Sequence, residues 1–255
     1  MAEKTIGTLW GISAGPGDPE LLTLKAARLL QTCPVVAFPA GRQGQPGVAQ
    51  SIIQSLLSSH QVQLPLTFPF VQDPAILETA WAEAADAAWE YLKVGQDVVF
   101  ATEGDASFYS TFTYLAHTLQ VRHPDAKIAT VPGVCSPLAA AAQLGMPLTI
   151  LQQRLLVLPA LYAIADLEAA LEQADVVVLM KVASVYADVW KILQRRNRLA
   201  HSRVIVRATQ ADEQIYADLS DHPHLDLPYF SLMIIYCDQS SSAPQATQRP
   251  DFRLG

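Results

Sequence analysis

Charged residues are scarce in this chain of 255 residues: Asp, Glu, Lys and Arg make up 16% of it, whereas 51% of the residues are hydrophobic. The apolar residues nevertheless fall in short runs, such as residues 176–180. No run approaches the roughly 18 consecutive apolar residues that a membrane helix requires. The first residues also lack the basic, apolar and small-residue order of a secretory signal. We therefore expect a cytoplasmic protein that does not span a membrane.

Disulfide and metal patterns are missing as well. The chain has three cysteines, Cys33, Cys135 and Cys237, and no Cys-x-x-Cys pair. This spacing argues against a disulfide framework and against a structural zinc site. His222 and His224, separated by one proline, match no zinc-binding pattern. The sequence therefore predicts no metal site.

A general basic surface is also absent, because the formal net charge is −7 and the pI is about 5.3. Proteins that bind nucleic acids rely on Lys and Arg contacts with phosphates. We therefore expect no nucleic-acid partner, although a local basic pocket remains compatible with this charge.

What the sequence does contain is an alternation of short apolar runs with segments of helical periodicity. In the first half, strands are expected at 5–12, 34–39, 62–68, 97–101 and 127–131, and helices at 20–31, 48–57, 73–94 and 108–121. In the second half, strands are expected at 154–158, 175–180, 203–208, 214–219 and 231–236, and helices at 166–173 and 185–197. Strands that are apolar throughout and alternate with helices indicate a mainly parallel sheet covered on both faces.

The fold class is therefore α/β with two domains. Residues 1–147 are expected to form an N-terminal α/β domain, and residues 148–238 a C-terminal α/β domain with a mixed sheet. The tail, residues 239–255, has too little apolar content to pack and is expected to be disordered.

Three loops that follow strands stand out. The first is Gly15-Pro16-Gly17-Asp18-Pro19, a rigid turn that matches neither the phosphate loop nor the Gly-x-Gly-x-x-Gly dinucleotide pattern. The second runs from Thr102 to Thr111, and the third from Val131 to Pro137. In open α/β sheets, ligands bind beyond the carboxyl ends of the strands. A structural alternative stays open for each loop: helix capping by Asp18, Asp105 or Ser107, and close helix packing by the alanines after Pro137.

These three loops, in this order, resemble those of the tetrapyrrole methylase family, and the resemblance extends from Ile6 to Tyr236. The segment from Glu103 to Thr111 is similar to the branch that methylates carbon 20 of precorrin-2. One departure is plain, because Ala106 stands where that family usually has proline. Losing proline frees a backbone dihedral and restores an N–H donor. We expect cofactor binding to survive, since Gly104 and Asp105 are retained.

The resemblance implies two α/β domains with S-adenosyl-L-methionine in the cleft between them, usually in a homodimer, and S-adenosyl-L-homocysteine as the product. The residues it implies for cofactor binding are Gly104, Asp105, Ser107, Phe108, Tyr109, Ser110, Cys135, Ser136, Met180, Ala208, Tyr229, Phe230, Ser231 and Leu232. The implied partner is a tetrapyrrole, precorrin-2 or cobalt-factor II, in cobalamin biosynthesis, with Pro16 facing it.

Methyl transfer from a sulfonium requires carbon, methyl and sulfur in line, so positioning can supply most of the catalysis. The ring carbon must then lose a proton. Asp105 or Glu103 is a candidate acceptor, with Tyr109 as the alternative. The substrate carries several carboxylates, which arginine pairs with in bidentate fashion. Arg42 is the first candidate for this contact. The further cationic candidates are Arg28, Arg154, Lys181 and Arg207.

Two other functions remain open. The chain can belong to another branch of the same family, one that modifies a different ring carbon, diphthine or ribosomal RNA. Alternatively, it can be a cofactor-binding subunit without catalytic activity.

Overall fold

The structure is a computed structural model that describes residues 5–41, 45–69, 71, 73–161 and 163–237. The chain divides into two compact units, Met1–Cys135 and Ser136–Gly255. The expected disordered tail at 239–255 and the substrate candidate Arg42 lie outside the described residues.

The first unit is built on a sheet of five parallel strands in the order β3-β2-β4-β1-β5. The strands are β1 (Thr8–Ser13), β2 (Val35–Pro39), β3 (Val62–Leu66), β4 (Val98–Thr102) and β5 (Lys127–Val131). The helices are α1 (Leu24–Thr32), α2 (Val48–Ile53), α3 (Pro74–Leu92) and α4 (Thr111–Arg122), with short 3₁₀ turns η1 (Pro19–Leu21) and η2 (Gln54–Leu56). The predicted parallel sheet is confirmed.

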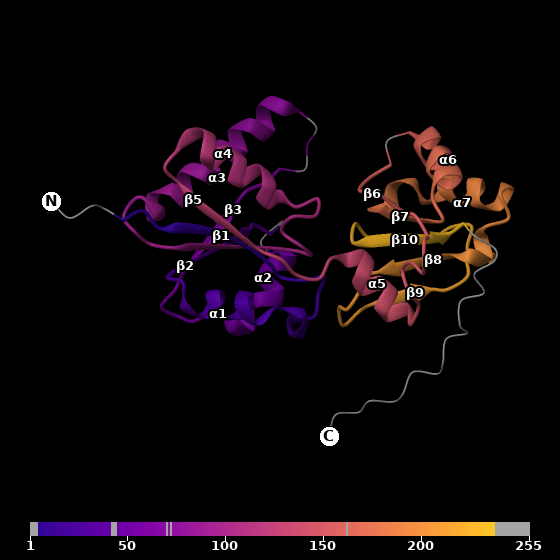
Figure 1. Cartoon of the computed structure of the whole chain (residues 1–255), viewed down its shortest axis with the longest axis horizontal. Helices are drawn as coiled ribbons and strands as arrows, with labels where there is room; N and C mark the ends of the chain where they lie inside the picture. Colours follow the sequence, from indigo (N-terminus) through magenta and orange to yellow (C-terminus); the bar gives the residue numbers. More distant parts are fainter. Residues whose placement is uncertain (1–4, 42–44, 70, 72, 162, 238–255) are drawn as a thin grey trace, which may run out of the picture. The chain divides into compact units, whose positions relative to one another are not determined.

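Both faces of the three central strands, β1, β2 and β4, are buried. Leu9 and Phe100 face the core under α3 and α4, whereas Ile12 and Val99 face the core under α1 and α2. Figure 1 shows the two helix pairs on opposite sides of the sheet. Successive side chains of a strand point to opposite faces, so a sheet covered twice needs strands that are apolar throughout.

The helix predicted after residue 73 begins as the sequence indicates. The Asp73 carboxylate accepts a hydrogen bond from the Ala75 N–H at 2.9 Å, and Pro74 occupies the first turn. The segment predicted as one helix from Glu20 is instead divided: Asp18 caps η1, and α1 starts only at Leu24, capped by Thr23.

The second unit contains a mixed five-stranded sheet in the order β6-β7-β10-β8-β9, in which only β6 and β7 are parallel. Its strands are β6 (Leu155–Leu158), β7 (Val176–Met180), β8 (Ser202–Val206), β9 (Gln214–Tyr216) and β10 (Ser231–Tyr236). Its helices are α5 (Ser136–Leu144), α6 (Ile164–Gln173) and α7 (Tyr186–Arg195), with 3₁₀ turns η3 (Val182–Val185) and η4 (Leu199–His201). The predicted mixed sheet is confirmed.

Helix α5 explains where the chain divides. Its Ala140 and Ala141 pack with Ile234 of β10 and Ile205 of β8, so the helix belongs to the core of the second unit. The division after Cys135 therefore precedes α5, whereas the sequence pattern predicts the boundary after residue 147. A run of small alanines gives no sign of which sheet it packs against.

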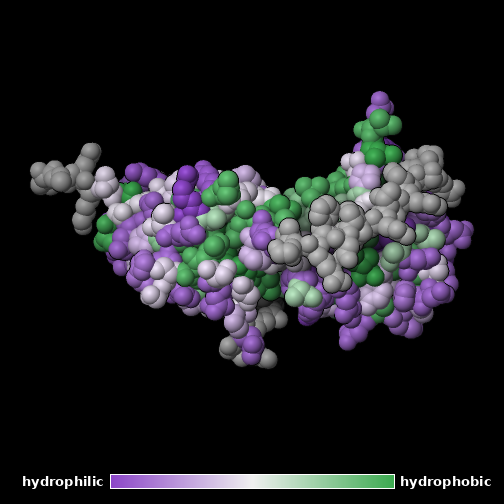
Figure 2. All heavy atoms as spheres, turned by 90° about the horizontal axis from the view of Figure 1, so that it is seen from below, coloured by the Kyte–Doolittle hydropathy of each residue, from purple (hydrophilic) through white to green (hydrophobic). Residues whose placement is uncertain are grey.

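Apolar side chains also reach the surface. Figure 2 shows hydrophobic and hydrophilic residues intermixed on the face in view, and Leu24 and Leu151 are among the most exposed large apolar side chains. Along the described residues, no helix is both long enough and apolar enough to cross a membrane.

Candidate functional site

Three loops meet at one edge of the first sheet. They follow β1, β4 and β5, which are adjacent and parallel, so their carboxyl ends lie together. Hydrogen bonds from strand to strand continue into the first two loops: the Ala14 N–H donates to the Thr102 carbonyl at 2.8 Å. Gly15 and Gly104 then pair in both directions, at 3.1 and 2.8 Å. The first two loops are therefore fixed to each other by their backbones.

The Asp105 carboxylate joins the second loop to the third. Its Oδ1 accepts from the Ser107 N–H at 2.8 Å and the Ser107 hydroxyl at 2.5 Å. Its Oδ2 accepts from the Gly133 N–H at 2.7 Å and lies 3.4 Å from the Ser13 hydroxyl. Burial alone would raise the pKa of Asp105, but these hydrogen bonds together lower it below its ordinary value. Asp105 is therefore an ionised anchor for the loops.

Ser13, which is not among the residues predicted from the sequence, lies at the centre of this arrangement. The residue is completely buried at the end of β1. Its hydroxyl donates to the Val131 carbonyl at 2.8 Å and accepts from the Ala106 N–H at 2.8 Å. The signal in the sequence is a polar residue at the end of an apolar strand, two residues before Gly15 of the Gly-Pro-Gly turn.

Ala106 uses the donor that a proline would lack. Its N–H is the group that binds Ser13, and its side chain is 1% exposed. The departure from the family pattern therefore adds one hydrogen bond to the loop.

The end of the second loop differs from the prediction in one respect: α4 starts at Thr111, so the helix expected from Phe108 is wrong in its start. Tyr109 has a φ of 52°, a left-handed conformation that a helix cannot include. Ser110 is the cap, accepting from the Phe112 N–H at 3.1 Å and donating to Thr102 Oγ1 at 3.1 Å. Neither Asp105 nor Ser107 caps α4, so the alternative interpretation of these two residues as helix caps is wrong.

Tyr109 is more than half exposed, and its ring meets that of Phe108 edge to face at 4.7 Å between centroids. Non-glycine residues with positive φ cost free energy and are found preferentially at functional sites. The loop thus presents an aromatic pair from a strained backbone.

Gly104 has a φ of +65°, and a Cβ built on it would meet no atom within 4 Å. The backbone between Glu103 and Asp105 is therefore open on this side, as a surface must be if a ligand is to approach the main chain closely.

Glu103 has a different environment from Asp105. Burial raises the pKa of its carboxyl above the ordinary value, while the backbone N–H groups of Glu103 and Ala49 oppose that rise. The pKa values of the two carboxyl groups in this loop are thus shifted in opposite directions. Asp105 is the carboxylate that stays ionised, and Glu103 is the one that takes up a proton more readily.

The candidates in the second unit gather at one end of its sheet. Leu232 of β10 pairs with Met180 at the end of β7, and the Arg207 N–H donates to the Phe230 carbonyl at 2.7 Å. The Ser231 hydroxyl donates to the Pro228 carbonyl at 2.7 Å. The six residues brought together here are Met180, Ala208, Tyr229, Phe230, Ser231 and Leu232.

Two of the candidate cations lie at this end. The Lys181 ammonium lies 5.4 Å from the centroid of the Tyr229 ring, and Arg207 forms an ion pair with Asp212. Lys181, Arg207 and Thr209 all have positive φ, so the strained backbone is concentrated here. Arg154 pairs with Asp175 at the opposite end of β7, and Arg28 is exposed on α1.

The other proposed contacts are placed as follows. Pro16 is buried within the first loop, Cys135 ends the first unit with a partly buried free thiol, and Ser136 is the first residue of α5. Arg42 remains a prediction. Among the described residues, no three His, Cys, Asp or Glu side chains are grouped to hold a metal ion.

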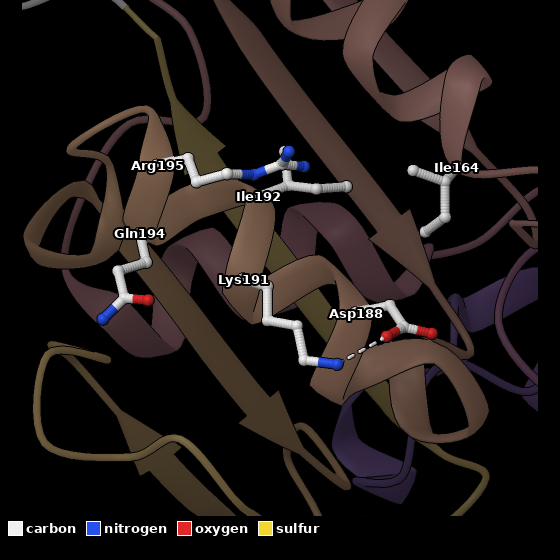
Figure 3. A pocket seen from close by; sticks show the side chains of 6 residues that line it. All are labelled: Ile164, Asp188, Lys191, Ile192, Gln194 and Arg195. Carbon is white, nitrogen blue, oxygen red and sulfur yellow. Dashed lines mark hydrogen bonds and ion pairs between the residues drawn. The ribbon is translucent and has the colours of Figure 1, made fainter.

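A surface hollow between α6 and α7 is a poor candidate for the site. Figure 3 shows its lining: Ile164, Asp188, Lys191, Ile192, Gln194 and Arg195. Lys191 is already paired with Asp188 at 3.1 Å, and Arg195 with Glu168 at 3.5 Å. The hollow contains none of the residues at the strand ends.

Fold and loops together define an α/β protein of two units, one with a parallel and one with a mixed sheet. The family model of the tetrapyrrole (corrin/porphyrin) methylases matches residues 8–222, and the chain belongs to this family.

Several similar sequences and solved structures are also tetrapyrrole methyltransferases by name. The chain is 35% identical to the cobalt-precorrin-2 C(20)-methyltransferase of Salmonella typhimurium, over 90% of this chain and 96% of that one. It is 30% identical to the precorrin-2 C(20)-methyltransferase of a Sinorhizobium species, over 92% of this chain and 97% of that one. A cobalt precorrin-4 methyltransferase structure superposes with a TM-score of 0.70 at 23% identity, covering 91% of this chain and 96% of that one. The structure of the uroporphyrin-III C-methyl transferase of Thermus thermophilus, complexed with S-adenyl homocysteine, superposes with a TM-score of 0.62 at 24% identity. The match covers 90% of this chain and 97% of that one.

Proposed function

We propose that this chain transfers a methyl group from S-adenosyl-L-methionine to carbon 20 of precorrin-2 or cobalt-factor II, in cobalamin biosynthesis. The observation that carries the proposal is the joined set of loops at the ends of β1, β4 and β5, with an open backbone at Gly104. Two relatives at 30% identity or more, aligned over nearly their whole length, carry the names of C20-methyltransferases.

The residues fit a methyl donor with an amino-acid end and a nucleoside end. Gly104 leaves room beside the main chain, and the Phe108–Tyr109 pair offers aromatic surface. We propose that the stretch from Gly104 to Ser110, with Cys135 and Ser136, holds the donor. Residues Met180, Ala208 and Tyr229 to Leu232 are proposed to contact it as well. When bound, the donor supplies an electrophilic methyl group on sulfur.

Glycine at residue 104 gives a direct test of donor binding. Gly104→Ala is expected to cost about 1 kcal/mol of stability from its left-handed backbone, and also to weaken S-adenosyl-L-homocysteine binding about tenfold or more, equivalent to ~1.4 kcal/mol. Titration calorimetry measures the affinity, and thermal unfolding the stability.

The matched control is Gly145→Ala. Gly145 has a φ of +64° and, like Gly104, no atom within 4 Å of a built Cβ, so the backbone strain is the same. Gly145→Ala should lower stability equally and leave the affinity unchanged. Equal affinities for both variants would show that nothing binds over Gly104.

We propose Glu103 as the proton acceptor. Asp105 is fully engaged by hydrogen bonds and has a lowered pKa, which makes it the weaker base. The raised pKa of Glu103 makes its carboxylate the stronger base of the two. Tyr109 remains the alternative.

Glu103→Gln is expected to reduce kcat roughly 100-fold, the loss typical of removing a general base. A base must be deprotonated to work, so wild-type kcat should fall as the pH drops through the raised pKa, above the ordinary glutamate value of about 4.3. The variant should lose this acid limb. Glu90→Gln, at an exposed ion pair with Lys93, is the control. An acid limb that persists unchanged in Glu103→Gln assigns the proton to another group.

The substrate carboxylates require a local group of cationic side chains, because the protein as a whole is negatively charged, with a net charge of −7. We propose Arg42, with Lys181 and Arg207 as further contacts, because the last two lie beside the aromatic residues of the second unit. Pro16 is proposed to face the ring. A homodimer in the cytoplasm, without a nucleic-acid partner, completes the proposal.

Turnover distinguishes this proposal from a cofactor-binding subunit without activity. Incubation with S-adenosyl-L-methionine and precorrin-2 or cobalt-factor II should add one methyl group to the ring that reacts. Because the methylated carbon loses a proton, the net gain in mass is that of one CH₂ group. Donor binding without any gain in mass would favour the inactive subunit.

A further inference from the structure

One hydroxyl group connects three segments of the first unit. Ser13 ends β1, yet its Oγ donates to the Val131 carbonyl at the start of the third loop and accepts from the Ala106 N–H in the second loop, each at 2.8 Å. The same Oγ lies 3.4 Å from Asp105 Oδ2. Ser13 is completely buried and Ala106 is 1% exposed, so water does not replace these bonds easily.

The bond between Ser13 and Ala106 restricts what residue 106 can be. Ala106 is the second residue of a turn closed by the Phe108 N–H and the Asp105 carbonyl at 3.1 Å. Proline is favoured at that position of a turn, so the turn itself would accept it. The Ser13 hydroxyl would not, because a proline has no N–H to donate. Its ring carbon Cδ would also point where the amide hydrogen now points, directly at Ser13 Oγ.

We propose that Ser13 and Ala106 are a coupled positioning pair for the methyl-donor site, a role that rests on the proposed function. By accepting the Ala106 N–H, the Ser13 hydroxyl fixes the second loop where Asp105 can accept the hydrogen bond from the Gly133 N–H. This also sets the position of Gly104. Neither residue needs to touch the donor. A residue with a backbone N–H is required at position 106 only when residue 13 carries a hydroxyl.

A double-mutant cycle on the full chain tests this coupling. The proteins are the wild type, Ser13→Ala, Ala106→Pro and the double variant, and calorimetry measures the Kd of S-adenosyl-L-homocysteine. Ser13→Ala should weaken binding about tenfold, and Ala106→Pro about 100-fold because it adds a collision to the lost bond. The double variant should bind about as well as Ser13→Ala, since the colliding oxygen is gone. A second substitution that restores affinity is a result that independent residues do not give.

The matched control is Ser202→Ala. Ser202 is also completely buried at a strand end, and its hydroxyl donates to the Arg198 carbonyl at 2.8 Å in the second unit. Both serine variants should lower the thermal midpoint, but only Ser13→Ala should change the Kd. Losses that multiply in the double variant, or an unchanged Kd in Ser13→Ala, overturn the proposal.

The outcomes also separate this proposal from the function it rests on. A wild-type protein that binds no S-adenosyl-L-homocysteine refutes the proposed donor and the positioning role with it. A wild type that binds, combined with independent losses, refutes the coupled pair alone and leaves the proposed function standing.

Discussion

Gly133→Ala is expected to disrupt the candidate site strongly. A Cβ on residue 133 would lie 2.4 Å from the Ser13 Cβ and 3.3 Å from the Ser13 carbonyl oxygen. Ser13 is completely buried in the central sheet and cannot move aside. The third loop must therefore shift, which breaks the 2.7 Å bond from the Gly133 N–H to Asp105. Overpacking of this kind costs typically about 1–3 kcal/mol.

Thermal unfolding and S-adenosyl-L-homocysteine binding both report this change. The midpoint should fall, and binding should be lost in the fraction that stays folded. Ser13→Gly removes the colliding Cβ, so the double variant should be more stable than Gly133→Ala alone. If Gly133→Ala kept wild-type stability and affinity, the packing of the third loop against β1 would not define the site.

Asp105→Asn is the second large effect that the structure predicts. Each carboxylate oxygen faces N–H or O–H donors, Ser107 on one side and Gly133 on the other. An amide must turn its NH₂ group toward one of them, so a donor then opposes a donor. Hydrogen bonds to charged groups contribute about 1.5–3 kcal/mol each, and the substitution also weakens their charge assistance. We expect a clear loss of stability and of donor affinity.

The pH dependence of this loss has a definite sign. The folded state lowers the pKa of Asp105, so its contribution to stability is fully present above the unfolded value of about 3.9. The contribution disappears as the pH falls through the lower folded pKa. The free energy of unfolding of the wild type and of Asp105→Asn should therefore differ most near neutral pH and converge in acid.

Denaturant unfolding between neutral and acidic pH measures the difference. Asp188→Asn is a suitable control, because Asp188 is an exposed aspartate paired with Lys191 at the surface, where such pairs contribute little. A constant difference between wild type and Asp105→Asn across the pH range would contradict the role of the ionised carboxylate as an anchor.

Much of the fold could be read from the sequence because local rules and packing agree there. The apolar run predicted at 231–236 matches β10 to the residue, and Asp73-Pro74 marks the start of α3. A strand buried on both faces has a strong apolar signal, and a capping aspartate followed by proline has a local cause. Neither feature depends on distant contacts.

The details of the site depend on contacts that the sequence does not display. Ser13 and Ala106 are 93 positions apart, so their hydrogen bond follows only from the pairing of β1 with β4. The start predicted for α4 was wrong because the left-handed Tyr109 delays the helix to Thr111. A tyrosine is an uncommon residue at positive φ, and no local pattern foretells it.

The most direct test of the central claim is the position of the transferred methyl group. The protein would be incubated with S-adenosyl-L-methionine carrying ¹³C in its methyl group and, in separate reactions, with precorrin-2 and cobalt-factor II. Nuclear magnetic resonance of the product then locates the label. We predict one label per ring, on carbon 20, and the ring that reacts identifies the natural substrate. A label on any other carbon, or on neither ring, would contradict the proposed function.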